Sequence, residues 1–197
     1  MGIALKIEPK VAPAYDPVSL SADPGPVGGD LYYQAARVFE SKGNLNSAIA
    51  HYEKALSQSP EYPLILVSYA RLYDRQGEFQ IADSLYQRAI RAAPDNPTAF
   101  NDLGMCFLRR GAAQAAVTLL SRAVELQPLN KLYRNNLAAA LVELGRADEA
   151  FPHLMVHGEA VAHYNLGFLL WKAQKPEEAR QQFLAALAVD PSLTPAR

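Results

Sequence analysis

Cysteine, net charge and long apolar runs are all scarce in this 197-residue chain. The single cysteine, Cys106, excludes an intramolecular disulfide and favours a reducing compartment. The formal net charge is only -1 and no basic stripe is visible, which argues against nucleic acid as a partner because phosphate binding needs concentrated positive charge. No apolar run approaches the roughly 18 residues that span a bilayer. We therefore expect no transmembrane helix and no membrane partner.

Sequence motifs of catalysis are also missing. The chain has no HExxH pattern, P-loop, Gly-rich dinucleotide fingerprint or nucleophile elbow. His153, His157 and His163 cluster, and the first two have the i, i+4 spacing that can chelate a metal. No further ligand pattern accompanies them, so we interpret them as surface or interface histidines, and Cys106 as a small buried apolar residue. The sequence thus predicts no enzyme activity, no metal and no cofactor.

Residues 1–28 differ in composition from the rest of the chain. Prolines interrupt regular structure there and glycines loosen the junction at residues 28 and 29, so we predict a tail or linker. Its apolar side chains leave two interpretations open: a flexible extension, or a segment that packs on the solenoid or lies in its groove. The start has no basic segment followed by a long apolar stretch, and Lys6 stands where a myristoylation motif needs Ser or Thr. We therefore expect a cytoplasmic protein.

What the chain does have is a repeat of 34 residues. Proline, glycine and alanine recur at this interval in separate ladders. These are Pro60, Pro94 and Pro128; Gly43, Gly77 and Gly111; Ala48, Ala82 and Ala116; and Ala55, Ala89 and Ala123. A repeat of this length is one supersecondary unit that cannot bury its apolar face alone and must stack on copies of itself. The chain is therefore predicted to be a solenoid that functions through its surface.

One repeat shows the pattern in full. The third repeat reads Phe100, Leu103, Gly104, Phe107, Gly111, Ala116, Leu120, Ala123 and Pro128. This pattern resembles the tetratricopeptide repeat, and the resemblance implies an all-α, right-handed superhelical solenoid of helix-turn-helix repeats that acts as a protein–protein interaction scaffold. The frame divides the chain into 29–62, 63–96, 97–130, a shortened 131–159, and 160–193.

Small residues and turn residues have distinct tasks in such a repeat. Gly104 and Gly167 are expected where the first helix of a repeat presses on the second, so that a larger side chain would overpack the contact. Gly43 and its equivalents are expected to end the first helix in a left-handed conformation.

The fourth repeat is irregular, because about one and a half helical turns are missing from its second helix. Pro152 and Gly158 limit that helix further, so we expect a brief segment that ends near His157. A weak fourth repeat is predicted to let the C-terminal part open independently.

In proteins with this repeat, ligands usually lie along the concave face that the first helices line. We transfer that face to this sequence by taking residues at a spacing of i, i+4 and i+7 along each first helix, and these are the candidate groove residues. These are Tyr33, Arg37, Arg71, Asn101, Met105, Asn135, Tyr164, Phe168 and Trp171. The N-terminal part of the lining is charged and the C-terminal part is apolar and aromatic, which would fit a peptide with a polar end and a hydrophobic end. Core packing is the alternative interpretation of the three C-terminal aromatic residues.

Other functions stay open. The carboxylate clamp by which one subgroup grips chaperones is not predicted, because Asn136 and Asn165 lack the flanking lysines. The solenoid is alternatively a structural protein that self-associates through its last helix, Glu177 to Val189, which no polar capping helix follows. It is also a candidate accessory subunit of an enzyme or of a secretion or pilus assembly machine, since Ala160 to Gly167 resembles repeats of bacterial proteins linked to pilus assembly.

Overall fold

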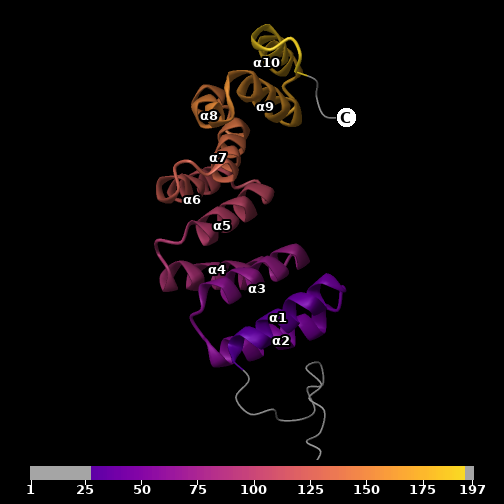
Figure 1. Cartoon of the computed structure of the whole chain (residues 1–197), viewed down its shortest axis with the longest axis vertical. Coiled ribbons are helices and arrows are strands. Elements are labelled where there is room, and N and C mark those ends of the chain that lie inside the picture. Colours follow the sequence, from indigo (N-terminus) through magenta and orange to yellow (C-terminus); the bar gives the residue numbers. More distant parts are fainter. Residues whose placement is uncertain (1–27, 194–197) are drawn as a thin grey trace, which may run out of the picture.

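The computed structural model describes residues 28–193, and within this range the chain folds into α-helices and one short 3-10 helix. The elements follow each other as α1 (Gly29–Ser41), α2 (Leu45–Gln58), α3 (Pro63–Gln76), α4 (Phe79–Ala92), α5 (Pro97–Arg109), α6 (Ala113–Leu126), α7 (Lys131–Glu143), α8 (Ala147–Leu154), η1 (Met155–His157), α9 (Glu159–Lys172) and α10 (Pro176–Val189). Successive pairs stack along the long axis of the molecule, from α1 and α2 at one end to α9 and α10 at the other (Figure 1). The all-helical, paired architecture predicted from the repeat is confirmed. The predicted tail, apart from Gly28, lies outside the described residues.

Helix boundaries follow from local backbone chemistry. Asn96 and Asn130 cap α5 and α7, because their side-chain oxygens accept hydrogen bonds from backbone amides of the first turn. Gly77 (φ 80°) and Gly111 (φ 77°) adopt the left-handed conformation that reverses the chain after a first helix. In the last repeat Gln174 takes the same turn at φ 59°, a conformation that a residue with a Cβ adopts at some cost.

Close contact between the two helices of a pair depends on a missing side chain. A Cβ on Gly104 would lie 2.8 Å from Cγ of Leu120, and one on Gly167 would lie 2.8 Å from Cδ1 of Phe183. Real Cβ atoms do not approach other atoms so closely, so each glycine allows its helix to lie against the second helix of the same repeat. The predicted role of these two glycines is confirmed.

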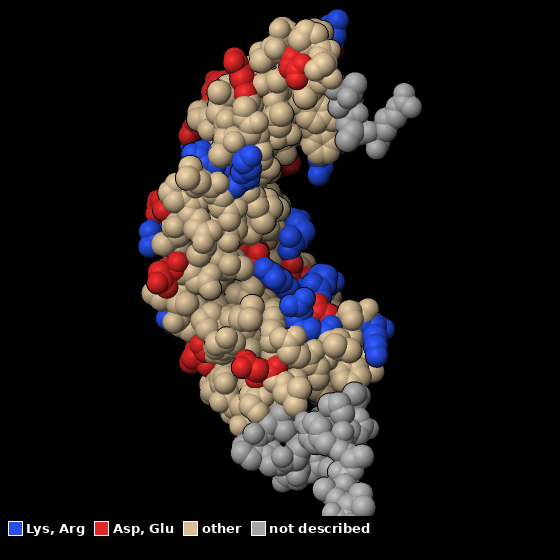
Figure 2. Space-filling view, viewed as in Figure 1, with Lys and Arg blue, Asp and Glu red and all other residues tan. Residues whose placement is uncertain are grey.

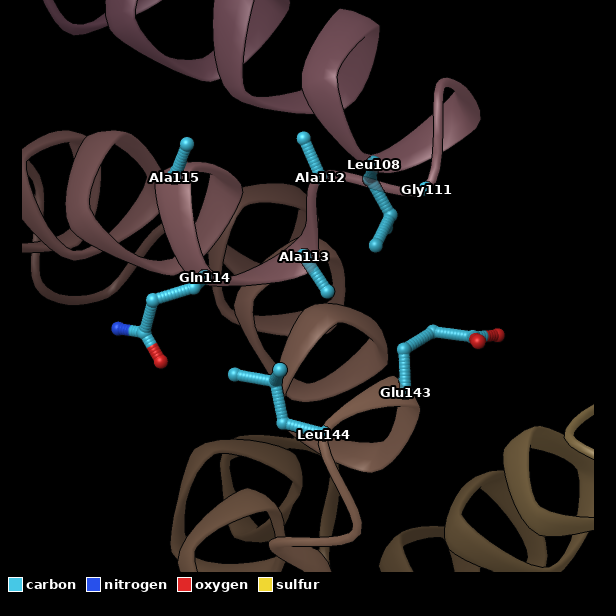
Figure 3. Close-up of a pocket in the computed structure, with 8 residues that line it drawn as sticks. All are labelled: Leu108, Gly111, Ala112, Ala113, Gln114, Ala115, Glu143 and Leu144. Atoms are coloured by element: carbon cyan, nitrogen blue, oxygen red, sulfur yellow. The ribbon is translucent and has the colours of Figure 1, made fainter.

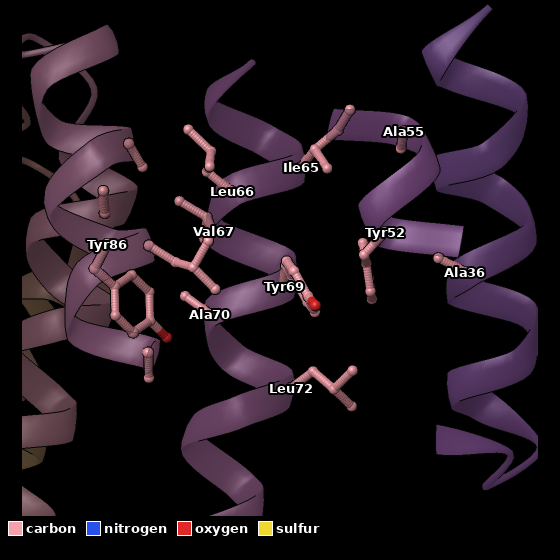
Figure 4. Close-up of a cluster of buried hydrophobic side chains, with 14 of the residues drawn as sticks. Ala36, Tyr52, Ala55, Ile65, Leu66, Val67, Tyr69, Ala70, Leu72 and Tyr86 are labelled. Carbon is pink, nitrogen blue, oxygen red and sulfur yellow. The ribbon is translucent and has the colours of Figure 1, made fainter. Parts of the chain in front are cut away.

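The core is continuous between pairs as well as within them. Figure 4 shows α3 with buried side chains on opposite sides: Ile65 and Tyr69 point toward Tyr52 of the first pair, and Leu66 toward Tyr86 of α4. All five of these side chains are buried. Each pair therefore buries its apolar surface only by stacking on the next pair, as the solenoid prediction requires.

Polar bonds join the first helices of successive repeats from α1 to α7. The hydroxyl groups of Tyr33 and Ser68 lie 3.1 Å apart, and Nδ2 of Asn136 donates to Oδ1 of Asn101 over 2.7 Å. In both pairs the partners are 35 residues apart. The first helices thus lie side by side with a register of one repeat plus one residue, and together they form one continuous face.

The fourth repeat has the short second helix that the sequence predicts. Helix α8 has 8 residues where α2, α4, α6 and α10 have 14. Pro152 lies inside it, and the single 3-10 turn η1 leads to Gly158 (φ 92°), the residue that precedes α9. Proline has no amide to donate, which weakens the helix at that point.

We expect the C-terminal part of the solenoid to open at lower free energy than the middle. Helix α8 is short, and the fully buried residues of α10 are only two alanines, Ala179 and Ala186, so little apolar surface holds the last helices in place. Native-state hydrogen exchange should therefore be faster in α8, α9 and α10 than in α3 to α6. Equal protection of the two groups of helices would contradict this account of repeat stability.

Candidate functional site

A broad hollow lies between the C-terminal halves of α3 and α5. It encloses about 950 Å³ and opens widely to solvent. Its lining includes Arg71, Asp74, Arg75, Asp102, Met105 and Arg109 from the two first helices, with Phe79 and Tyr86 of α4 at its edge. In Figure 2 the molecule curves around this side, and basic side chains gather in the hollowed region with acidic groups between them. The first helices therefore form a concave, charged groove.

Ion pairs in the groove join successive first helices. Arg75 contacts Glu40 and Arg109 contacts Asp74, both across 35 residues. Arg71 donates from Nε to Oδ2 of Asp102 over 2.5 Å. Asp102 also accepts a 3.0 Å hydrogen bond from Nδ2 of Asn101, so it is held in place from two directions.

The two members of each groove pair differ in exposure. The arginine side chains are 46% exposed in Arg71 and 56% in Arg75 and Arg109. Their carboxylate partners are only 14%, 20% and 6% exposed, in that order. The carboxylates thus lie beneath the guanidinium groups, and the groove presents mainly cations to solvent.

Three of the predicted groove residues have their polar groups committed inside the protein. Tyr33 and Asn101 are buried, at 3% and 4% exposure, and both bond to neighbouring first helices. Asn135 is half-buried, and its Oδ1 lies 2.8 Å from Nε2 of His157. Tyr33 and Asn101 are therefore not part of the accessible groove surface, which corrects the prediction from the sequence. Their spacing does place them on the predicted face of the first helices, but the next first helix covers them.

Three other predicted groove residues, one each in the first, third and last repeats, are exposed or half-buried. Arg37 is exposed, and its Nη1 lies 3.4 Å from the hydroxyl oxygen of Tyr33. Met105 is half-buried and lines the hollow beside Arg71. Tyr164 is half-buried, and its ring packs against Phe183 with centroids 5.6 Å apart. Tyr164 thus serves mainly the contact between α9 and α10.

Phe168 and Trp171 are exposed on α9. Their exposed fractions are 44% and 61%, and their ring centroids lie 6.1 Å apart. Lys172 places its Nζ 5.8 Å from the centre of the Phe168 ring. The alternative that Trp171 is a core residue is wrong, because most of its surface is in water.

Two arginines of the groove were not among the predicted residues. Arg75 and Arg109 stand one position beyond the i, i+4, i+7 face, at the C-terminal ends of α3 and α5. A signal for them exists in the sequence, since they are 34 residues apart and their partners Glu40 and Asp74 are also 34 residues apart. Acidic and basic residues that each recur at the repeat interval indicate ion pairs between repeats, because opposite charges attract at short range.

A smaller hollow of about 400 Å³ lies at the junction of the third and fourth repeats. Figure 3 shows its lining, which comes from the end of α5, the turn after it, the first residues of α6 and the end of α7. Half of the lining residues are glycine or alanine, and Glu143 is the one ionisable side chain among them. It brings no acid and base together, and we assign it no chemistry.

The cysteine and the histidines also lack a catalytic arrangement in the described range. Cys106 is completely buried, and burial raises the pKa of its thiol to about 12, helped by a hydrogen bond with Asp74. Burial lowers the pKa of His153 and of His157, and the positive charges of Arg134 and Lys131 lower them further. Among residues 28–193 no group of three or more His, Cys, Asp or Glu side chains is placed to hold a metal ion.

Among the helices of residues 28–193, none combines the length and the apolar character required to cross a bilayer.

Comparison with known proteins agrees with this geometry. Sequence models described as tetratricopeptide repeat match residues 29–62, 69–130, 114–154 and 160–193. Among solved structures, YrrB, described as a tetratricopeptide repeat protein with an unusual peptide-binding site, is 25% identical with a TM-score of 0.61, over 82% of this chain and 86% of YrrB. A search of curated proteins found no match.

Two crystal structures of MamA have the same fold. One is 20% identical with a TM-score of 0.66, over 86% of this chain and 98% of MamA. The other is 21% identical with a TM-score of 0.62, over 79% of this chain and 94% of MamA. Proteins built from this repeat mediate protein–protein interactions on a scaffold that is typically non-catalytic. Because the matching models together span most of the chain and coincide with its stacked helix pairs, this protein belongs to the tetratricopeptide repeat family.

Proposed function

We propose that this protein is an adaptor that holds a segment of a partner protein in the groove of its first helices. The groove begins at the hollow between α3 and α5, which Arg71 and Met105 line. By the frame of the repeats, Phe168 and Trp171 of α9 occupy the positions of Arg37 and Glu40 in α1. A segment lying along this face would therefore meet charged groups first and aromatic groups last. We place this activity in the reducing cytoplasm, which a chain with a single, buried cysteine favours.

The observation that carries the proposal is the exposure of Trp171. A tryptophan that is 61% exposed leaves a large apolar surface in water, at a cost of roughly 25 cal/mol per Å². A partner that covers this ring recovers that free energy, and tryptophan is among the residues that contribute most to protein interfaces. Phe168 beside it, 44% exposed, enlarges the same apolar surface. The peptide-binding site named for YrrB supports a peptide as the kind of ligand.

Selection from a random peptide library displayed on phage tests this function directly. The protein should recover peptides above the background of an empty surface, and a synthetic copy of a recovered peptide should bind in isothermal titration calorimetry with one site per chain. Recovery of no peptide would contradict the proposal. Binding that survives removal of the groove side chains would contradict the location.

Self-association is a second candidate, which the surface of α10 favours. Leu184, Leu187 and Val189 are 55%, 45% and 47% exposed there, and no further repeat within the described residues covers them. A second copy stacked on this face would bury them as a next repeat does. Size-exclusion chromatography with light scattering separates the two functions. An adaptor should have the mass of one chain, whereas a self-associating solenoid should have a multiple of that mass. The substitution Leu184→Lys should return the self-associating form to the mass of one chain.

A further inference from the structure

We propose that the segment held in the N-terminal half of the groove is acidic, so that its Asp and Glu side chains bind a cluster of four arginines. The arginine cluster consists of Arg37, Arg71, Arg75 and Arg109, from α1, α3 and α5. This inference rests on the proposed function, because it names the chemistry of the peptide that the groove takes. The placement of the cluster, the accessibility of its guanidinium groups and their free hydrogen-bond donors support it.

Hydrogen-bond donors of the cluster exceed the acceptors that the protein supplies. A guanidinium carries five N–H donors in a planar fork. Arg71 bonds to Asp102 through Nε alone, and Arg75 and Arg109 contact their carboxylates through Nη2 alone. Each of these arginines therefore keeps an unused edge, to which a carboxylate can bind through two parallel hydrogen bonds. Arg37 forms no ion pair with a carboxylate of the described residues, and its one side-chain partner there is the hydroxyl of Tyr33.

Charge in the groove is also incompletely balanced. The four arginines share three carboxylates, Glu40, Asp74 and Asp102, although the whole chain has a formal net charge of -1. Arg110, which also lines the hollow, is balanced by Asp83 through two hydrogen bonds. The concave region of Figure 2 accordingly shows mostly basic side chains around a few acidic ones. A hollow of about 950 Å³ with cations on its rim concentrates the positive potential there and attracts anionic segments.

Ion pairs outside the groove have a different geometry. Arg122 pairs with Glu125 and Arg146 with Glu149, each three residues apart along the chain, and there the acid is 63% and 57% exposed and the arginine 49% and 38%. In the groove the order is reversed, since Asp74 is 6% exposed and Arg109 is 56%. The buried carboxylates hold the guanidinium groups at the surface, in position for an external anion, and this preorganisation lowers the cost of binding.

A peptide fits these observations better than a nucleic acid. Arg71, Arg75 and Arg109 line one hollow and Arg37 lies on the neighbouring first helix, so the cluster offers no extended basic track along which a phosphate backbone could run. Single-stranded nucleic acid requires bases stacked on aromatic rings beside the phosphates. Of the two rings that line the hollow, Tyr86 is buried and Phe79 already has the guanidinium of Arg110 over it, 4.9 Å from the ring centre. Phe168 and Trp171 lie on a separate repeat. An acidic stretch followed by apolar residues would match both ends of the groove.

The test compares peptide selection on three forms of the protein. Short random peptides displayed on phage are selected on the wild type, on the double variant Arg37→Gln/Arg71→Gln, and on Arg122→Gln/Arg146→Gln, which removes the same charge outside the groove. Peptides from the wild type and the control should be enriched in Asp and Glu, and this enrichment should disappear on the groove variant. For one synthetic acidic peptide, affinity should fall about tenfold in the groove variant and fall with added salt, since accessible charges are screened.

The possible outcomes separate the acidic ligand from the peptide-binding function. Peptides recovered without acidic enrichment, or acidic peptides that bind the groove variant as well as the wild type, would overturn the acidic ligand and leave the peptide-binding function standing. Recovery of no peptide on any form would overturn both. If the groove variant does not fold, replacement of Glu by Gln in the synthetic peptide tests the same contacts on the wild-type protein, and unchanged affinity would overturn the proposal. Equal binding of a short single-stranded oligonucleotide would show a general anion site instead.

Discussion

Replacement of Gly104 by leucine is expected to lower the free energy of unfolding by about 1 to 3 kcal/mol, the usual cost of an overpacked core contact. The first added carbon would lie 2.8 Å from Cγ of Leu120 and 3.3 Å from the backbone oxygen of Ala116. Leucine also has a better helix propensity than glycine, by roughly 1 kcal/mol, which offsets part of the loss. Urea unfolding followed by circular dichroism measures the difference.

Ala115→Leu is the matched control for this substitution. Ala115 is exposed on α6 of the same repeat, so the added side chain meets solvent and stability should stay within about 0.5 kcal/mol of the wild type. Gly104→Ala should fall between the two variants. A Gly104→Leu protein as stable as the wild type would mean that α5 does not press on α6, and the frame of the repeats would be wrong.

Truncation of Trp171 to alanine is expected to reduce the affinity for a groove peptide by about 2 kcal/mol or more, as at other aromatic anchors of interfaces. The melting temperature should change little, because the ring is 61% exposed and few contacts within the protein are lost. A peptide recovered by selection is the ligand, with calorimetry for its affinity and a thermal melt for stability.

Two controls bracket the Trp171→Ala result. Leu129 is 82% exposed and lies in the loop between α6 and α7, so Leu129→Ala should alter neither affinity nor stability. Tyr86 is 1% exposed, and Tyr86→Ala should destabilise the fold by about 3 to 5 kcal/mol, as removal of a large core side chain does. A large fall in melting temperature for Trp171→Ala would place its ring in the core, and unchanged affinity would remove it from the binding surface.

The sequence predicts the fold well because the residues that start and end its helices act locally. Pro63, Pro97 and Pro176 start helices, and glycines such as Gly77 end them, since proline has no amide to donate and glycine accepts a positive φ. The short α8 also follows from local residues, Pro152 and Gly158. None of these features depends on how one repeat packs on the next.

Accessibility of the groove residues is harder to predict, because it depends on contacts between repeats. Tyr33 and Phe168 both lie on the predicted face, yet the first is 3% exposed and the second 44%. The period of the helix gives the direction of a side chain, whereas the neighbouring first helix decides whether that side chain is covered. Tyr33 is covered by α3 through Ser68.

The arginine cluster is hard to predict from the sequence for the same reason, because it forms only when repeats stack. No run of basic residues appears in the sequence, since Arg37, Arg71 and Arg109 lie in three different repeats. The stack brings Arg71 and Arg109 to one hollow and Arg37 to the first helix beside it, because each repeat adds a first helix beside the last one. Charge patterns therefore have to be compared between repeats at the 34-residue interval, as for Arg75 and Arg109, rather than along the chain.

Amide chemical-shift mapping by NMR, with a selected peptide added to the isotope-labelled protein, tests the central claim most directly. If a peptide lies in the groove, the largest shifts should fall on the first helices α3, α5 and α9, at and around Arg71, Met105 and Trp171, while the second helices α4 and α6 change little. Shifts confined to α4 and α6, or to the exposed face of α10, would contradict binding in the groove.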